Sequence, residues 1–508
     1  MKKYIFLIFL VLVSYSCQEN EKPRAGFGEV SITGVQLING TPSIENENTW
    51  IHQFDNSLDL NFINEEGQSF QLTINPNDFS KPYTIELAFG NYTFSGEQFA
   101  GDISEYLPIK IEGSFNLSQE KQTINLPANT EYGLITISQS QTSQKPIFIS
   151  DPSSIFFEKE NVFYSYGKDG FKTSVEISID APSNKFKTIT QFTRFQHLAK
   201  QIVKKDESAT DNFELVDFII LKETILLDQD NKPLNLMPSI IDELDISMNE
   251  SSGLAYIENR LFSINDEDNS AKIQEVDPLN GSLIREIVVE NAINSDWEDL
   301  AQSDTHLFIG DFGNNRGTRK NLNILKISIQ DLLSSSSVEA EKIEFSFADQ
   351  FDFSGSVETN NFDCESFFFL DNQLHLFTKN WENNKTRHYL VQLDKPLQEI
   401  LPIEEFDSKG LITGADISHD GKNIVLLGYE NIGIASRSFI WLISEFSGNE
   451  FFSGTKRKTL LGSPSILSQT EGIIFRNHSE IFISGEKINF SGLEIPSKLS
   501  EINLAGLF

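Results

Sequence analysis

A short unit of strand, turn and strand recurs along the second half of this chain. The most complete copy runs from Asp296-Trp297-Glu298-Asp299-Leu300-Ala301 through a turn to His306-Leu307-Phe308-Ile309-Gly310-Asp311. The same layout begins at four more places: Ser252-Gly253-Leu254-Ala255, Glu365-Ser366-Phe367-Phe368, Ala415-Asp416-Ile417-Ser418 and Glu471-Gly472-Ile473-Ile474. A repeat every roughly 45–70 residues is the spacing of propeller blades. The repeat therefore predicts a β-propeller in this half of the chain.

We place the propeller at residues 232–508 and leave its blade number at five or six. Asn280-Gly281 and Asp420-Gly421 predict hairpin turns, because such dipeptides readily adopt left-handed backbone conformations. Five units are visible, and Leu234–Ile246 could join Leu493–Leu507 to form a further blade that closes the ring. A length of about 275 residues at about 45 per blade fits five or six blades, and we favour six.

The part of the chain before the propeller also alternates apolar and polar residues. Leu58–Phe62 and Phe70–Ile74 place apolar residues at every second position, which predicts strands with one buried face. We expect a β-sandwich at residues 27–145 and a second β-rich domain, or an extension of the first, at residues 146–231. Four apolar residues in the latter region fall at helical spacing: Phe192, Phe195, Ala199 and Ile202. The expected fold class is all-β, with an N-terminal β-sandwich region followed by a five- or six-bladed β-propeller.

The N-terminus has the features of an export signal. Lys2-Lys3 precede an apolar run, Ile5–Val13, that is too short to span a bilayer. Ser16-Cys17 follows, and a cysteine after a small residue resembles the cleavage site of bacterial lipoproteins, with plain secretion as the alternative. We therefore expect a lipoprotein signal peptide at residues 1–16, lipidation of Cys17 and a tether at residues 17–26.

The lipid on Cys17 would anchor the exported protein to a bilayer of the cell envelope. The expected location is the outer membrane, and the side of the membrane that the protein faces stays open. Besides Cys17 the chain has only Cys364, so no disulfide is expected to stabilise its domains.

Acidic residues strongly outnumber basic ones. The chain has 74 Asp and Glu against 40 Lys and Arg, which gives a net charge of -34. Such a surface repels the phosphates of nucleic acids, so we exclude nucleic acid as a partner. The charge suits divalent cations, although charge that only maintains solubility is the simpler interpretation.

Carboxylates recur at fixed places in the repeat. Glu298, Glu365 and Glu471 occupy one position, and Asp299 and Asp416 occupy the next. A further set lies where the second strand of a unit ends: Asp266, Asp311 and Glu486. Equivalent positions of the blades converge on the axis of a propeller, where hard oxygen ligands favour calcium or magnesium. The candidate metal ligands are Asp266, Glu298, Asp299, Asp311, Glu365, Asp416 and Glu471, with calcium as the expected cofactor if any is bound.

The carboxylates also have a simpler explanation than metal binding. Each carboxylate could instead cap a turn or accept hydrogen bonds from backbone amides of its own blade.

Arg316 and Trp297 are candidate ligand-binding residues, since an Arg could meet an anionic group and an exposed indole could stack on a sugar. Arg316 and its neighbour Arg319 could also simply neutralise nearby carboxylates, and Trp297 could pack inside a blade.

Several motifs of the repeat together resemble a group of secreted bacterial six-bladed propellers. They are residues 250–255, the pair within 296–315, Asp363-Cys364-Glu365, residues 413–418 and residues 470–472. The group is similar, more distantly, to calcium-dependent phytase-like and gluconolactonase-like propellers. Cys364 departs from the small residue expected at that place. The resemblance implies a propeller with an acidic central face and leaves catalysis open.

Binding without catalysis is the leading functional hypothesis. An envelope-anchored lipoprotein would bind a ligand or partner, such as a glycan, a small molecule or an envelope protein, on the acidic face of its propeller. The alternative is a calcium-dependent hydrolase of a phosphoester or lactone, with Glu298 or Glu365 as the catalytic base. A structural role in envelope assembly is a third hypothesis. The sequence contains no Gly-x-Ser-x-Gly motif and no phosphate-binding Gly-rich loop followed by Lys.

Overall fold

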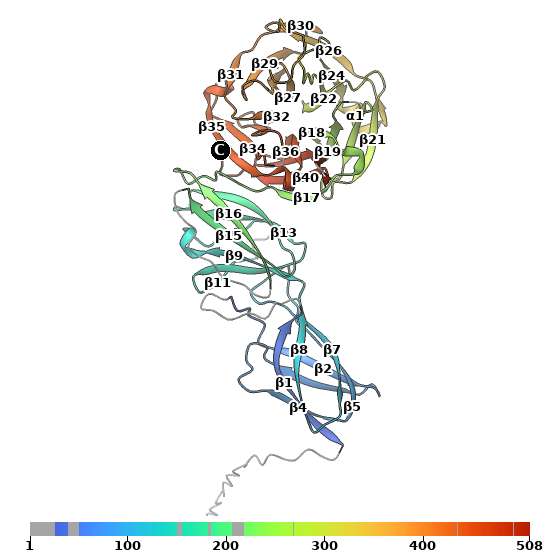
Figure 1. Ribbon diagram of the computed structural model, residues 1–508, viewed down its shortest axis with the longest axis vertical. Coiled ribbons are helices and arrows are strands. Elements are labelled where there is room, and N and C mark those ends of the chain that lie inside the picture. Colours follow the sequence, from blue (N-terminus) through green and yellow to red (C-terminus); the bar gives the residue numbers. More distant parts are fainter. Residues whose placement is uncertain are drawn as a thin grey trace, which may run out of the picture. The chain divides into compact units, whose positions relative to one another are not determined.

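The computed structural model describes residues 26–38, 50–149, 155–180, 184–205, 218–267, 269–433, 435–490 and 492–508. Strands dominate these residues, which confirms the all-β class (Figure 1). The predicted signal peptide and Cys17 lie outside the described residues. No helix among the described residues is long and apolar enough to cross a membrane. The chain divides into two compact units, Met1–Glu131 with Leu215–Phe218, and Tyr132–Glu214 with Ile219–Phe508.

The first unit is built on one seven-stranded sheet. Its strands, in spatial order, are β3 (Ser69–Ile74), β2 (Leu58–Asn64), β5 (Gly90–Glu97), β7 (Lys110–Leu117), β8 (Lys121–Asn129), β1 (Phe27–Leu37) and β4 (Tyr83–Ala88). Neighbours are antiparallel except β1 and β8, which run parallel. Leu58, Leu60 and Phe62 on β2 are buried while the residues between them are more exposed, so the period-two pattern lines one face of the sheet.

The second unit begins with two further sheets. The larger one contains, in order, β11 (Phe157–Lys159), β12 (Val162–Lys168), β9 (Tyr132–Ser138), β15 (Gln196–Lys204) and β16 (Ile219–Leu227). The smaller one contains β10 (Ile147–Phe148), β13 (Lys172–Ser178) and β14 (Lys185–Gln191).

The helical spacing of Phe192, Phe195, Ala199 and Ile202 predicted the wrong structure. Residues 196–204 form strand β15, which pairs in parallel with β9 on one side and β16 on the other. A strand with partners on both sides satisfies its backbone groups through segments distant in sequence, and this overrides a local period of 3.6.

The rest of the second unit is a propeller of five blades, and each blade is a sheet of at least four strands. In order from the axis outward, blade 1 contains β18 (Ser251–Ile257), β19 (Arg260–Asn265), β20 (Lys272–Val276) and β21 (Leu283–Val289), and blade 2 contains β22 (Trp297–Gln302), β23 (His306–Asp311), β24 (Asn323–Ser328) and β26 (Glu341–Phe347). Blade 3 contains β27 (Cys364–Leu370), β28 (Gln373–Thr378), β29 (Thr386–Gln392) and β31 (Glu404–Phe406), and blade 4 contains β32 (Leu411–Ile417), β33 (Ile424–Tyr429), β34 (Ser438–Ser444) and β35 (Thr455–Gly462). Blade 5 contains β36 (Gln469–Phe475), β37 (Glu480–Glu486), β40 (Lys498–Asn503) and β17 (Ser239–Glu243).

The ring closes with five blades, so the preference for six is wrong. The innermost strands β18, β22, β27, β32 and β36 contact one another in sequence, and β36 contacts β18 again. The segments 234–246 and 493–507 do share a blade, as predicted, because β17 pairs with β40. They complete the fifth repeat rather than adding a sixth, which closes the ring by hydrogen bonds between the two ends of the domain.

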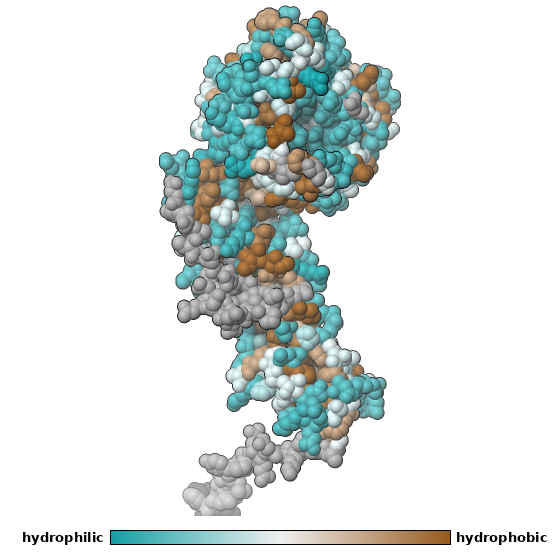
Figure 2. Space-filling model, in the orientation of Figure 1, coloured by the Kyte–Doolittle hydropathy of each residue, from teal (hydrophilic) through white to brown (hydrophobic). Residues whose placement is uncertain are grey.

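Apolar side chains fill the spaces between adjacent blades. Trp297, Leu300 and Ile309 pack against residues of blade 1, and Phe312, Phe367 and Leu376 join blades 2 and 3. The surface over the propeller is largely hydrophilic with scattered apolar patches (Figure 2), consistent with the excess of acidic residues.

Candidate functional site

Every innermost strand of the propeller contains one extra residue at the same place. In blade 2, Trp297 pairs with Asp311 and Asp299 pairs with Gly310, which leaves Glu298 unpaired in the ladder. The same shift in register occurs in the other four blades. Such β-bulges re-aim a side chain and are frequent beside functional sites.

The strand pairing defines three equivalent positions near the axis. The bulge position is the unpaired residue of the innermost strand, and the entry position lies two residues before it in the chain. The return position lies at the end of the second strand. It directly follows the second-strand residue that pairs with the innermost-strand residue just before the bulge. The bulge position holds, from blade 1 to blade 5, Ser252, Glu298, Glu365, Thr413 and Glu471. The entry position holds Glu250, Asp296, Asp363, Leu411 and Gln469. The return position holds Asp266, Phe312, Lys379, Tyr429 and Glu486.

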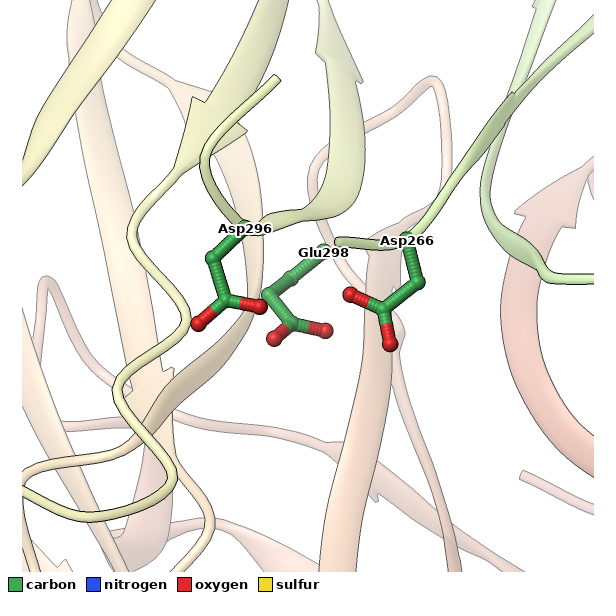
Figure 3. A group of neighbouring side chains, drawn as sticks. All are labelled: Asp266, Asp296 and Glu298. Carbon is green, nitrogen blue, oxygen red and sulfur yellow. The ribbon is translucent and has the colours of Figure 1, made fainter. Parts of the chain in front are cut away.

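Three carboxylates from these positions lie side by side between blades 1 and 2. Oxygen atoms of Asp266, Asp296 and Glu298 lie within 4.8 Å of one another. Their carboxyl groups point in the same direction (Figure 3). Glu298 also belongs to a second such group, with Asp363 and Glu365, so its side chain joins the two groups. We call these five residues the acidic centre.

Two oxygen atoms of the acidic centre are buried without a hydrogen-bond partner. They are Oδ1 of Asp296 and Oε1 of Glu298, on side chains that are almost fully buried. Gly313 lies directly against Glu298, because a Cβ at this residue would be 2.0 Å from Oε1 of Glu298. A buried carboxylate oxygen without a partner is costly, so these atoms fit a bound cation, whose coordination they could complete.

Burial and mutual repulsion shift the titration of these groups. Burial, together with the charges of Asp266 and Asp363, raises the pKa of Asp296 to about 8. Burial likewise raises the pKa of Asp266 to about 6. The pKa of Glu298 lies well above its usual value, because the side chain is buried and faces Glu365. Like charges in a low-dielectric site disfavour ionisation unless an opposite charge compensates them.

A buried lysine compensates the other side of the acidic centre. Nζ of Lys379 lies 3.1 Å from Oε1 of Glu365. Burial acts to lower the pKa of Lys379, but the charges of Glu365 and Glu471 outweigh it and raise this pKa well above its usual value. Gln469 donates to Oε1 of Glu471 at 2.7 Å and to Glu486 at 3.2 Å. The blade 3 to blade 5 side is therefore supplied with donors.

The blade 1 to blade 2 side has less compensation. Arg319 lies 3.7 Å from Oδ2 of Asp296 but pairs more closely, at 2.7 Å, with Asp311. The charge of Lys379 also acts on this side, where it offsets part of the rise in the pKa of Asp266. Asp363 of the second group is already engaged, since it accepts hydrogen bonds from the Asn314 amide and the Trp381 indole. A cation would therefore be held best by Asp266, Asp296 and Glu298.

Asp299 and Asp416 do not occupy equivalent positions of the repeat, so this prediction is wrong. The strand pairing places Asp416 two positions further along its blade than Asp299, so the two do not form one ring. Asp299 accepts hydrogen bonds from the amides of Leu300 and of Phe367 in blade 3. Asp416 accepts from the amide of Phe475 in blade 5, at 2.7 Å. Both residues bond to backbone of the neighbouring blade and stay apart from the acidic centre.

Asp311, predicted as a metal ligand, and Trp297 and Arg316, predicted as ligand-binding residues, lie outside the acidic centre. Asp311 lies one residue before the return position and pairs with Arg319 and Asn323. Trp297 is fully buried in the apolar contact between blades 1 and 2 and offers no surface to a ligand. Arg316 lies on the exposed loop that follows Gly313. Of the two arginines, Arg319 is the one that neutralises carboxylates.

Lys379 was not predicted from the sequence as a site residue, and Asp296 and Asp363 were named only as parts of motifs. Lys379 occupies the same repeat position as Asp266 and Glu486, so an alignment of the second strands would have found a basic residue in an acidic column. Asp296 and Asp363 each precede a bulge glutamate by two residues. In a regular strand this spacing already puts two side chains on one face.

Comparisons with known proteins do not identify a family. No family model matches the chain, and no curated protein matches it. Solved structures to which it is similar include hydrazine synthase of Kuenenia stuttgartiensis, at 9% identity over 61% of this chain and 70% of that one, with a TM-score of 0.27. A 6-phosphogluconolactonase-like protein of Bacteroides uniformis has 9% identity over 53% and 74% of the two chains and a TM-score of 0.25. The WD40 propeller domain of Doa1 has 10% identity over 52% and 96%, with a TM-score of 0.27.

Proposed function

We propose that the acidic centre binds a divalent cation and that the propeller holds a ligand there without catalysing its reaction. The donors are all carboxylate oxygens, which favours calcium or magnesium over zinc. Asp266, Asp296 and Glu298 supply three carboxylates, whereas calcium takes six to eight oxygen ligands. Open coordination positions would remain for water or for an acidic or hydroxylated ligand.

The single observation that supports this proposal most is the pair of buried, unpartnered oxygens on Asp296 and Glu298. Simple solubility does not require carboxylates that are removed from water. Nor does packing within a blade explain them, since Asp299 and Asp416 show how this fold satisfies a structural carboxylate, through backbone amides. A cation would compensate both the charge and the unused lone pairs.

Cys17 and the export signal complete the proposal. A lipid on Cys17 would hold the protein at the envelope, and the β-rich regions that precede the propeller in the chain would link it to this anchor. Mass spectrometry of the mature N-terminus tests this part, because a diacylated or triacylated Cys17 is expected. An unmodified N-terminus at another residue would contradict it.

Calorimetric titration of calcium into the full mature chain, after treatment with a chelator, tests cation binding. Micromolar binding is expected, weakened at least tenfold by Glu298→Gln and by Asp296→Asn. Asp304→Asn is the matched control, because this exposed acidic residue lies in the turn between β22 and β23. Absence of binding by the unaltered chain, or equal binding by all variants, would refute the proposal.

One observation favours the hydrolase as a second candidate. Glu298 belongs to both carboxylate groups, so Glu365 would lie next to a cation held by Asp266, Asp296 and Glu298. A bound cation would polarise a phosphoester or lactone, and Glu365 or Glu298 could accept a proton from the attacking water. Turnover of phosphoester or lactone panels with calcium present, lost in Glu365→Gln, would replace the binding proposal with this one.

A further inference from the structure

A cavity opens on the face of the propeller that contains the acidic centre. It lies between blades 4 and 5, has a volume of about 200 Å³, and is lined by Tyr429, Asn431, Gln469, Thr470, Ile488 and Phe490 among others. These residues belong to the ends and starts of strands on the same face as the entry and return positions. A volume below the roughly 300–1,000 Å³ of drug-sized sites suits one ring or a short chain.

The chemistry of the lining is unlike the rest of this acidic molecule. None of the described residues that line the cavity has a charged side chain, although the chain has a net charge of -34. Nε2 of Gln469 already donates to Glu471 and Glu486. The buried hydroxyl of Thr470 donates to Ser438. The polar groups offered to a ligand are therefore the side-chain amide of Asn431 and Oε1 of Gln469, beside apolar surface from Ile488 and Phe490. Such a lining offers neutral donors and acceptors to hydroxyl groups and flat apolar surface to a ring.

Tyr429 brings this cavity next to the buried charges at the propeller axis. It lines the cavity and occupies the return position of blade 4, where Nζ of Lys379 lies 5.6 Å from its ring centroid. The same Nζ lies 3.1 Å from Oε1 of Glu365, a member of the acidic centre. Gln469, which also lines the cavity, donates to Oε1 of Glu471 at the bulge position of blade 5. The cavity is thus linked to the acidic centre through Tyr429 and Lys379, and one ligand could extend from the cavity to the acidic centre.

The rim of the cavity is open and apolar. Phe490 is 53% exposed on the short hairpin of β38 (Ile488–Phe490) and β39 (Leu493–Ile495), and Ile432 is exposed on the loop after β33. An aromatic ring held on a hairpin at the edge of a polar cavity is suited to stack on the CH face of a sugar ring.

We infer that this cavity is a saccharide subsite, which takes one neutral pyranose ring of a ligand whose acidic group reaches the acidic centre. The ligand class is therefore an acidic glycoside. The part that concerns the acidic group rests on the proposed cation binding, whereas the neutral ring would bind through the lining of the cavity alone.

Saturation-transfer NMR on the full mature chain tests the inference with two probes: a glucuronide disaccharide, methyl β-D-glucuronosyl-(1→4)-β-D-glucoside, which joins an acidic ring to a neutral one, and methyl β-D-glucoside, which has the neutral ring alone. Both should receive saturation at their ring protons, and the glucuronide signal should at least double when calcium replaces chelator. Phe490→Ala and Asn431→Ala should each lower both signals at least threefold. Phe351→Ala is the matched control, since Phe351 is 88% exposed and does not line the cavity.

The outcomes separate the two proposals. Glucoside binding in chelator that Phe490→Ala abolishes would support the subsite even if calorimetry found no cation. Calcium binding without a saturation signal from either probe would overturn the subsite and leave cation binding intact. Signals that Phe490→Ala and Asn431→Ala leave unchanged would also overturn it. Both substitutions affect exposed residues, so folding is expected to be retained, and circular dichroism checks this.

Discussion

Nζ of Lys379 lies 3.1 Å from Oε1 of Glu365, and both side chains are buried near the axis of the propeller. Lys379 is the buried basic residue that compensates the carboxylates on the blade 3 to blade 5 side of the acidic centre. The attraction within a buried charge pair adds little to stability, because it is offset by the cost of removing both charges from water. Removing one partner is costly, since the other charge is then left uncompensated in a low-dielectric site.

Lys379→Met should destabilise the propeller by about 3–5 kcal/mol, the cost of breaking a buried pair by removing one partner. Urea unfolding followed by tryptophan fluorescence measures this, since Trp297, Trp381 and Trp441 all lie in the propeller. Lys422→Met, at an exposed lysine, is the control. A loss below about 1 kcal/mol, the range of exposed pairs, would show that Glu365 is satisfied without Lys379.

Glu298→Gln should raise the melting temperature of the calcium-free protein, because it removes one of several carboxylates that repel one another. The same change should abolish stabilisation by calcium. A ligand at 100 times its Kd stabilises the native state by about 2.7 kcal/mol, which corresponds to a shift of several degrees. Differential scanning calorimetry with calcium or chelator measures both effects. A variant that melts earlier without calcium would mean that Glu298 is held by contacts other than a cation.

Asp299→Ala should destabilise the propeller without weakening calcium binding. It leaves the amides of Leu300 and Phe367 without an acceptor, at a cost of about 1–3 kcal/mol for each buried group. Asp299→Asn keeps one acceptor oxygen and should lose less. Urea unfolding and calorimetric titration of both variants measure the two effects. Weaker calcium binding by the Asn variant would make Asp299 a metal ligand after all.

The pair His375 and His388 should make the propeller sensitive to acid. Nδ1 of His375 lies 2.9 Å from Nε2 of His388, and His388 Nδ1 lies 3.1 Å from Glu404. Burial lowers the pKa of His375 from 6.5 to about 3, and burial also lowers the pKa of His388. The unfolded state therefore binds more protons below pH 6.5, so stability is present above that pH and is lost progressively from pH 6.5 towards pH 3.

His375→Phe tests this prediction, because a phenyl ring fits among Phe368 and Phe451, which already contact His375. The melting temperature should fall less steeply between about pH 6.5 and about pH 4 in this variant than in the unaltered protein. His419→Gln, at an exposed histidine, should leave the slope unchanged. Equal slopes in all three proteins would assign the acid sensitivity to other groups.

Glu298, Glu365 and Glu471 show how far a repeat can be followed from sequence. Each was assigned to one position because the blades share a local pattern, and the structure places all three at the bulge position. Asp299 and Asp416 looked just as regular, yet a difference of two residues in register sends them to different contacts. Register is set by cross-strand pairing, which the spacing of motifs does not report.

Lys379 and the blade number depended on contacts between distant segments. Lys379 lies 14 residues from Glu365 in the chain, and an isolated lysine at the end of a strand is ordinarily a solvated residue. The strand at Ser239–Glu243 is likewise too short to reveal whether it opens a new blade or completes the last one. Its pairing with Lys498–Asn503 decides this.

Local periodicity and a repeated unit are enough to predict the all-β class, the propeller and the acidic column of glutamates. Contacts between blades were needed to find the five-bladed ring, the compensation of one side of the acidic centre by Lys379, and the buried oxygens without partners on Asp296 and Glu298 on the other side. A side chain's charge compensation and desolvation depend on which residues of other blades surround it, and these neighbours are fixed when the ring closes.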